Sequence, residues 1–276
     1  MTIAPALPHT FAARTRWALA DTWTVTLRYL THLRRAPERI AIGLAFPIIS
    51  ILLFGYVFGS AIPMPGNGNY NEYLIPGMFV QAMVFGIAGQ SVAVAADVAR
   101  GIGDRFRSMP MSPVAVVSGQ TGAEVIYATL DLVVMAVCGL VVGWRFHGSV
   151  GEMLAAFGLL LMLRFAATWI GLYLGLIVRG PEGAGTLTPL LFPVIMISNA
   201  FVPTDSMPTW LRVVAEWNPV SATVGAIRQL FHNPTLTSAD ASWPMRHPVL
   251  MAVVWPIVLT AIFLPLAVRR YQRMSR

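Results

Sequence analysis

Six long apolar runs constrain what this chain can fold into. A helix needs about 20 apolar residues to cross the hydrocarbon core of a bilayer, because it rises only about 1.5 Å per residue. The runs cover residues 40–58, 74–96, 114–142, 152–178, 186–202 and 248–268. Only 11% of the 276 residues are charged, whereas soluble domains have about 25%. The sequence therefore predicts an all-α polytopic membrane protein with six transmembrane helices.

Prolines fall inside several of these runs. They are Pro47, Pro189, Pro193, Pro256 and Pro265. Membrane helices tolerate proline because neighbouring helices can satisfy the backbone groups that it leaves unpaired. We therefore expect all six runs to cross the membrane despite their prolines.

The arginines predict the orientation. All 19 basic residues are arginine, and 14 of them fall in segments that are cytoplasmic if the N-terminus is inside. Four others fall in outer segments, and Arg164 lies within the fourth run. Basic residues accumulate on the cytoplasmic side of membrane proteins. We therefore predict a multi-pass protein of the cell (inner) membrane with both termini in the cytoplasm. Since topology accounts for the net charge of +7, we do not expect nucleic acid as a partner.

The N-terminal segment, residues 1–37, has the pattern of an amphipathic helix. Apolar side chains recur every third or fourth position, at Leu19, Trp23, Leu27, Leu30 and Leu33. Pro37 then ends the pattern. We expect an interfacial helix that lies on membrane lipid, with a helix packed on the protein itself as the alternative. The six-helix transmembrane domain would follow at 38–268 and a cytoplasmic tail at 269–276.

The last outer segment, residues 203–247, is long and only partly polar. Within it, residues 220–231 are apolar enough to form a short helix. This stretch is too short to cross a bilayer, and such segments are usually re-entrant or interfacial. We therefore predict a partly re-entrant outer segment.

Several kinds of catalytic site are missing from the sequence. A Walker A loop needs a lysine after its glycines, and the chain has no lysine. The five histidines and Cys138 form no cluster with metal-ligand spacing. No GxSxG motif is present. We therefore expect a protein that is not an enzyme, with no catalytic residue, no metal and no cofactor of its own.

Three charged residues lie within the apolar runs. They are Glu124, Asp131 and Arg164, and each would cost about 2.5–3.5 kcal/mol at the centre of a membrane helix. Because residues 143–151 form a short connection, the third and fourth helices should be antiparallel neighbours. Counting from that connection places Asp131 and Arg164 at nearly the same depth. We expect these two residues to form an ion pair between the helices, with a role in the translocation path as the alternative.

The most distinctive segment is the polar loop between the second and third runs, residues 97–113. It reads DVARGIGDRFRSMPMSP, which by itself indicates a short, charged surface loop. It resembles the D-x-x-x-G-x-x-x-R-[FL]-R-S-[ML]-P-[MV]-S signature of type-2 ABC exporter permeases, close to the daunorubicin-resistance branch. Five further stretches agree with that family and occur in its order: LFGYVFG at 53–59, YLIPGM at 73–78, SNAFVP at 198–203, MPTWL at 207–211 and WNPVS at 217–221.

This resemblance implies the membrane-spanning subunit of an exporter for a hydrophobic or amphipathic compound, such as a drug or a lipid. It implies two partners, a separate ABC ATPase that binds ATP and magnesium and a second permease subunit, identical or different. The family's contact with the ATPase maps to Arg100, Gly101, Asp104, Arg105, Arg107 and Pro110. The first, second and fifth spans would line the path, with Tyr56, Gln81, Phe85, Gln90 and Asn199 as candidate residues. Polysaccharide or glycolipid export and secondary transport remain alternatives.

Overall fold

The computed structural model describes residues 16–17, 20–24, 26–27, 31, 45, 47–58, 70–101, 113–235 and 241–273. Within these residues all regular structure is helical, as predicted. The helices are η1 (Phe54–Phe58), α3 (Tyr70–Ala99), α5 (Pro113–Val142), α6 (Val150–Ile177), α7 (Gly180–Gly185), α8 (Thr188–Met196), η3 (Thr204–Ser206), α9 (Thr209–Glu216), α10 (Pro219–Phe231), α11 (Trp243–Arg246) and α12 (Pro248–Arg273).

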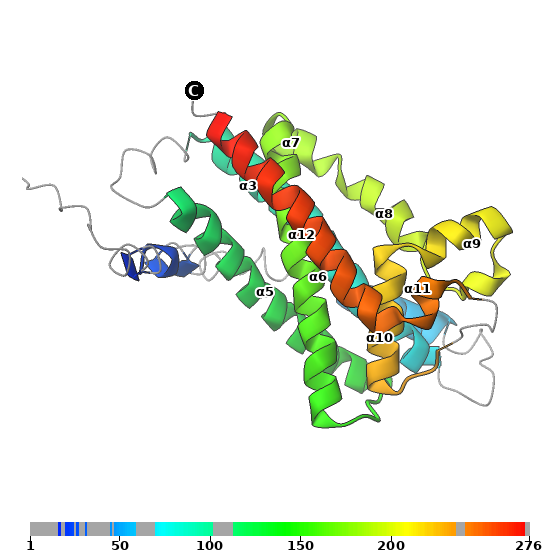
Figure 1. Cartoon of the computed structure of the whole chain (residues 1–276). Helices are drawn as coiled ribbons and strands as arrows, with labels where there is room; N and C mark the ends of the chain where they lie inside the picture. The colour runs from blue at the N-terminus through cyan, green and yellow to red at the C-terminus, as the bar shows by residue number, and fades with distance from the viewer. Residues whose placement is uncertain are drawn as a thin grey trace, which may run out of the picture.

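Four of the described helices are long and apolar enough to cross a membrane. They are α3, α6, α12 and the Thr121–Val142 part of α5. In Figure 1 they form an inclined bundle, in which α6 contacts α3, α5 and α12. α3 is the most buried of the four, whereas α5 and α12 turn many apolar side chains outward. The second, third, fourth and sixth predicted spans are thus confirmed as long apolar helices.

The fifth predicted span is not a continuous helix. The run at 186–202 contains only α8, which has nine residues and is about 14 Å long, against a hydrocarbon core of about 30 Å. Pro189 stands in the first turn of α8 and Pro193 lies inside it, and the helix ends before Ile197. The two prolines therefore lie in a short helix, whereas the sequence predicted a helix over the whole of 186–202.

The broken segment nevertheless runs the length of the bundle. It leaves the end of α6 at Ile177, and its residue Asn199 accepts a hydrogen bond from the hydroxyl of Tyr73, near the start of α3. α7 and α8 both contact α3 between these points. The chain thus passes from one end of the bundle to the other through two short helices.

The first predicted span is described only in part. An apolar helix covers Pro47–Tyr56 and continues as the π-helical turn η1. Most of residues 40–46 lie outside the described part of the chain, so the structure does not confirm a helix that spans the membrane.

The predicted N-terminal amphipathic helix is also only partly described. Described residues between 16 and 31 are helical, and Trp23 and Leu27 of the expected apolar face are exposed. The Thr26 hydroxyl donates a hydrogen bond to the Gly119 carbonyl of α5 over 3.1 Å. Leu19, Leu30 and Leu33 lie outside the described residues, so the interfacial helix stays a prediction.

One end of the bundle, called the loop end here, is formed by residues 143–149 between α5 and α6. Gly143 has a φ of 106°, which favours glycine and ends α5. Ser149 and Glu152 form a reciprocal capping box at the start of α6. The Trp144 ring packs edge-on against Phe231 at 5.1 Å between centroids, and its indole N–H donates to the Asn233 amide oxygen. The glycine that ends α5, the capping box that begins α6 and the contact between two aromatic rings therefore fix the loop end.

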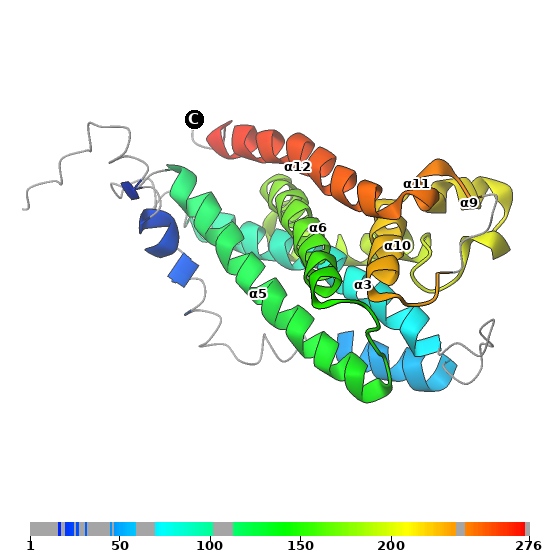
Figure 2. The same ribbon diagram turned by 60° about the horizontal axis from the view of Figure 1, so that its bottom comes forward.

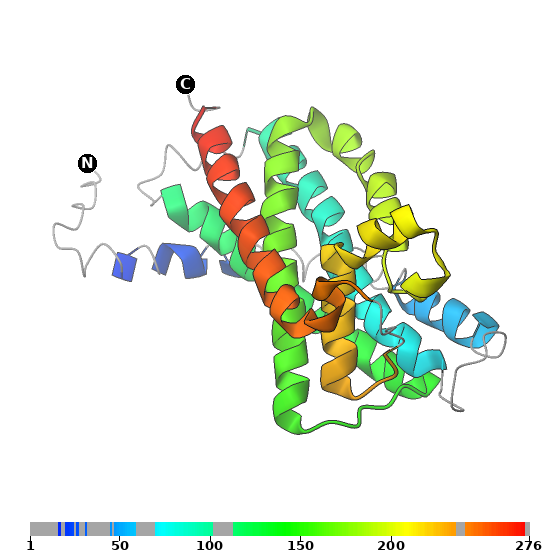
Figure 3. The ribbon, with the colours of Figure 1, turned by 45° about the vertical axis from the view of Figure 1, so that its right-hand side comes forward.

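The short helix predicted at 220–231 is confirmed as α10. It begins at Asn218, whose side chain caps the helix, and ends at His232 in the left-handed conformation. α10 packs against α3, α6 and α12, and Figure 3 shows it beside the loop-end halves of α6 and α12.

α3 and α6 approach each other closely because two glycines of α6 face α3. A Cβ atom on Gly171 would lie 2.6 Å from the Ile87 carbonyl oxygen, and one on Gly175 would lie 2.6 Å from that of Ser91. Small residues spaced four apart are a common means of bringing membrane helices together. These glycines set the separation of the two central helices.

We predict that Gly171→Ala lowers the stability of the protein by about 1–3 kcal/mol, because the added methyl group meets backbone that cannot move aside alone. Gly158→Ala on the same helix is the control, since nothing lies within 4 Å of a Cβ there. It should leave stability unchanged or raise it by up to about 1 kcal/mol. Thermal unfolding of the purified chain in detergent measures both variants. Equal midpoints for the two would contradict the close packing.

Candidate functional site

Arg164 and Glu124 form an ion pair in the middle of the bundle. Arg164 lies near the centre of α6 and is only 5% exposed. One guanidinium nitrogen, Nη2, lies 2.7 Å from the Glu124 Oε2 atom of α5. The guanidinium rests against Gly86 of α3, where a Cβ atom would fall 1.6 Å from Nη1. One arginine thus connects the three helices α3, α5 and α6.

The predicted pairing of Asp131 with Arg164 is wrong. Asp131 is 7% exposed, and its Oδ1 atom has no hydrogen-bond partner within the described part of the chain. The residue count assumes that α5 and α6 run side by side, whereas Figures 1 and 3 show them crossing at an angle. Equal distances from the loop therefore do not give equal depth. The arginine meets the carboxylate two turns closer to the other end of α5.

The five candidate path residues do not gather on one face of this chain. Gln81, Gln90 and Asn199 are buried, Phe85 is half-buried and Tyr56 is exposed. The Gln90 side chain packs on Gly171 between α3 and α6, while Asn199 lies at the loop end. A role for these residues in the path stays a prediction.

Only the first two residues of the predicted coupling site are described. α3 ends at Ala99, Arg100 is exposed, and Gly101 has a φ of 63°, which an L side chain rarely adopts. Gly101 therefore marks the point where the loop leaves the helix. Asp104, Arg105, Arg107 and Pro110 lie outside the described residues, so their docking role stays a prediction.

Arg228 of α10 is a buried anchor that the sequence analysis missed. It is 2% exposed, and its three guanidinium nitrogens donate hydrogen bonds of 2.9 Å to the carbonyl oxygens of Tyr73, Asn199 and Ala200. The guanidinium carbon also lies 3.5 Å from the centroid of the Tyr73 ring, a cation–π geometry. Arg228 thereby joins α10 to the start of α3 and to the turn after α8.

We had counted Arg228 among the arginines of an outer segment. The available signal was its position as the one charged residue in the apolar stretch 220–231. A lone arginine in such a stretch indicates a buried charge that needs several acceptors.

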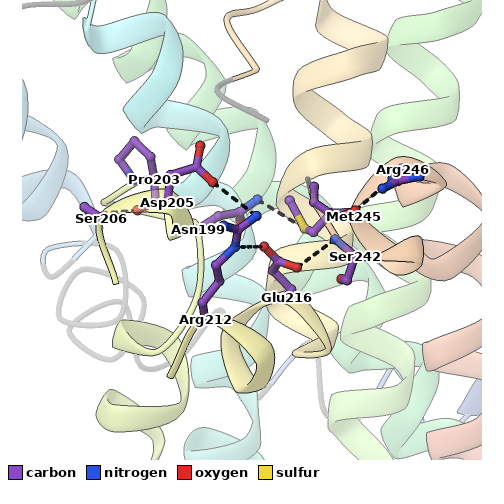
Figure 4. A network of polar contacts seen from close by, with 10 residues as sticks. Asn199, Pro203, Asp205, Ser206, Arg212, Glu216, Ser242, Met245 and Arg246 are labelled. Atoms are coloured by element: carbon purple, nitrogen blue, oxygen red, sulfur yellow. Dashed lines mark hydrogen bonds and ion pairs between the residues drawn. The ribbon is translucent and has the colours of Figure 1, made fainter. Parts of the chain in front are cut away.

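A second polar network holds α9 to α11, as Figure 4 shows. Arg212 donates to the Glu216 carboxylate over 2.7 Å and lies 3.6 Å from Asp205. The other Glu216 oxygen accepts the backbone N–H of Ser242 over 2.8 Å. Burial raises the pKa of the Glu216 carboxyl, but the bonds from Arg212 and Ser242 outweigh burial, and its pKa lies below the usual range. The stability that Glu216 contributes is therefore present above its unfolded-state pKa and is lost as the pH falls through the lower folded-state pKa.

No group of three or more His, Cys, Asp or Glu residues is placed to hold a metal ion within the described ranges. Arg228 instead contacts backbone carbonyls, and Arg164 contacts Glu124 across helices. Such contacts fix the relative positions of membrane helices.

These features define the class of the protein. It is a multi-pass helical membrane protein with four long apolar helices, in which short helices replace the fifth predicted span and α10 packs against the bundle. The chain belongs to the ABC-2 type transporter family, whose model matches residues 20–232.

Two relatives agree with this assignment. The chain is 30% identical over 254 residues to the daunorubicin resistance ABC transporter permease protein DrrB1 of Streptomyces coeruleorubidus, covering 89% of this chain and 86% of that protein. It is 30% identical over 202 residues to the doxorubicin resistance ABC transporter permease protein DrrB of Mycobacterium tuberculosis, covering 70% of this chain and 68% of that one. The resemblance inferred from the sequence is confirmed.

We predict that Glu124→Gln destabilises the protein and that Asp131→Asn does not. Breaking a buried pair leaves an uncompensated charge and costs about 3–5 kcal/mol, and the lower end applies because Glu124 is partly exposed. Neutralising Asp131 instead removes a buried carboxylate that lacks a hydrogen bond at Oδ1. Thermal unfolding in detergent compares the two variants. A larger loss for Asp131→Asn would show that Asp131 is the true partner of Arg164.

We also predict that Gly86→Ala displaces the Arg164 guanidinium and lowers stability by about as much as Glu124→Gln, because the methyl group occupies the place of the guanidinium. Gly89→Ala on the same helix is a matched control, with open space at its Cβ position. In the Glu124→Gln background the additional effect of Gly86→Ala should be much smaller, since both changes disrupt one contact. Simple addition of the two losses would count against this coupling.

Proposed function

We propose that this chain is the membrane-spanning permease subunit of an ABC exporter driven by a separate ATPase. The observation that carries the proposal is the match of residues 20–232 to the ABC-2 family. The chain has no lysine and so no Walker A motif. In this proposal another polypeptide hydrolyses ATP.

The exported compound is hydrophobic or amphipathic in this proposal. This choice of compound class is supported by the similarity to permeases named for daunorubicin and doxorubicin resistance. Export of a polysaccharide or glycolipid is the second candidate, because such exporters share the sequence motifs that carried the resemblance. Antibiotic efflux is the first activity to test.

In this proposal both termini lie in the cytoplasm and the loop end faces outward. The structure supports this orientation because α3, α6 and α12 all end at the bundle end opposite to the loop end. Arginines that the sequence assigns to the cytoplasm stand at or just beyond those helix ends: Arg100, Arg179, Arg269, Arg270 and Arg273. Positive charge on the inner side is the usual arrangement.

Two copies of the permease, or two different permeases, would enclose the path. The first helix offers an apolar surface for such a contact: Ile49, Leu52, Leu53 and Tyr56 are exposed at helical spacing on one side. Tyr56 is the one candidate path residue that is fully exposed in this chain. α10 would be the re-entrant part of the outer segment.

The test of the proposal is transport in proteoliposomes with daunorubicin as the probe. The chain with its ATPase should accumulate the probe only when ATP and magnesium are supplied. The chain alone should show neither hydrolysis nor transport. Transport by the lone chain without nucleotide would overturn the proposal in favour of a secondary transporter.

We predict that replacing Arg105 and Arg107 together with alanine uncouples the ATPase from transport, because these residues lie in the loop expected to dock on it. The matched control is Arg269→Ala with Arg273→Ala, which removes two exposed arginines from the same side of the membrane. ATP-driven transport should fall at least tenfold in the loop variant, which corresponds to a loss of about 1.4 kcal/mol of coupling. Transport by the control variant should stay near that of the wild type. Equal transport by both variants would contradict the docking role of Arg105 and Arg107.

A further inference from the structure

α9 has two faces of opposite character. Trp210, Val213, Val214 and Trp217 follow one another at helical spacing and are all exposed, Trp210 by 71% and Trp217 by 50%. These four residues, of which Trp217 directly follows the end of α9 at Glu216, are called the aromatic stripe of α9 here. On the other side of the helix, Ala215 and Glu216 are buried and Arg212 is partly buried.

The polar side of α9 holds the helix in place. Arg212 and Glu216 bond to each other and to residues before and after α9, as described above. Immediately after the stripe, the Asn218 amide donates to the carbonyl oxygens of Val194 and Ile197 over 2.7 and 2.6 Å. Contacts on three sides therefore fix the rotation of α9 and leave the aromatic stripe turned outward.

α9 lies beside an end of the spanning helices. Glu216 is bonded to Ser242, and α11 and then α12 follow directly from that residue. Figures 1 and 2 show α9 at the side of the bundle, close to α11 and the start of α12. α12 is a membrane-spanning candidate that begins at Pro248. The stripe is therefore near the level at which α12 enters the bilayer.

We propose that the aromatic stripe of α9 lies in the membrane interface, with its side chains at the boundary between lipid headgroups and acyl chains. Tryptophan is enriched at this depth because its ring is apolar and its N–H is polar. Helices with one apolar and one charged face lie in the plane of the interface. α9 would then anchor the outer segment to lipid and keep the broken fifth crossing and α10 at a fixed depth.

A second copy of the chain is a poorer occupant for this face. α9 has eight residues and is about 12 Å long, and the stripe on it and its C-cap has only four side chains. A stable protein interface buries about 800 Å² on each partner, far more than this stripe supplies. Lipid needs no matching surface and surrounds the bundle at this level. The proposal depends only on a membrane-embedded bundle, so it stands whether or not the exporter function is correct.

The experiment uses nitroxide spin labels on the full chain in phospholipid nanodiscs, with Cys138→Ser as the background. Labels go on Val213→Cys and Val214→Cys, whose side chains are half-exposed. Val137→Cys on the exposed face of α5 is the control within the membrane, and Ser206→Cys is the control in the outer segment. The accessibility of each label to oxygen and to a water-soluble nickel chelate gives its depth.

Both stripe labels should be reached more readily by oxygen and less readily by the nickel chelate than the Ser206 label, at a depth shallower than Val137. Nickel accessibility equal to that of Ser206 would place the stripe in water and overturn the proposal. Exclusion of both reagents, with dipolar broadening between labels on two copies, would show a contact between subunits and overturn it as well.

Discussion

The close contact between α3 and α6 determines where the other long helices can lie. Gly171 and Gly175 let the two backbones approach until an added Cβ atom would touch a carbonyl oxygen. The same approach brings Arg164 against Gly86, and from there the guanidinium reaches Glu124 of α5. α12 packs on α6 as well. In lipid, where apolar burial does not drive helices together, such small-residue contacts and interhelical hydrogen bonds supply the attraction.

The carbonyl groups at the helical break after α8 have hydrogen-bond partners. A helix that stops inside a bilayer exposes backbone oxygens that lipid cannot satisfy. The carbonyls that follow α8 are bound by side chains of α10 and its cap: Asn218 binds Ile197, and Arg228 binds Asn199 and Ala200. Tyr73 of α3 adds a bond to Asn199. α10 therefore stabilises the break, which explains why a short, arginine-bearing helix packs inside the bundle.

The length of each apolar run predicted the long helices and the short α10. Bilayer thickness is fixed, so a run either is or is not long enough to cross it. The same reasoning failed at the fifth run, since counting apolar residues ignores that the helix there is short and ends at Met196. Charge placement was predicted less well. The sequence identified Arg164 and two carboxylates on one face of α5, but the crossing angle of α5 and α6 selects Glu124 rather than Asp131.

The buried and the surface anchors differ in the groups that they join. Arg228 binds three backbone carbonyl oxygens. At the loop end, His147 lies 3.0 Å from Glu72 and His232 lies 3.0 Å from Glu152, and both imidazoles are exposed. These histidine contacts lie at the surface and join the connection at 143–149 to α3 and the end of α10 to α6. The buried bonds of Arg228 instead hold the turn after α8.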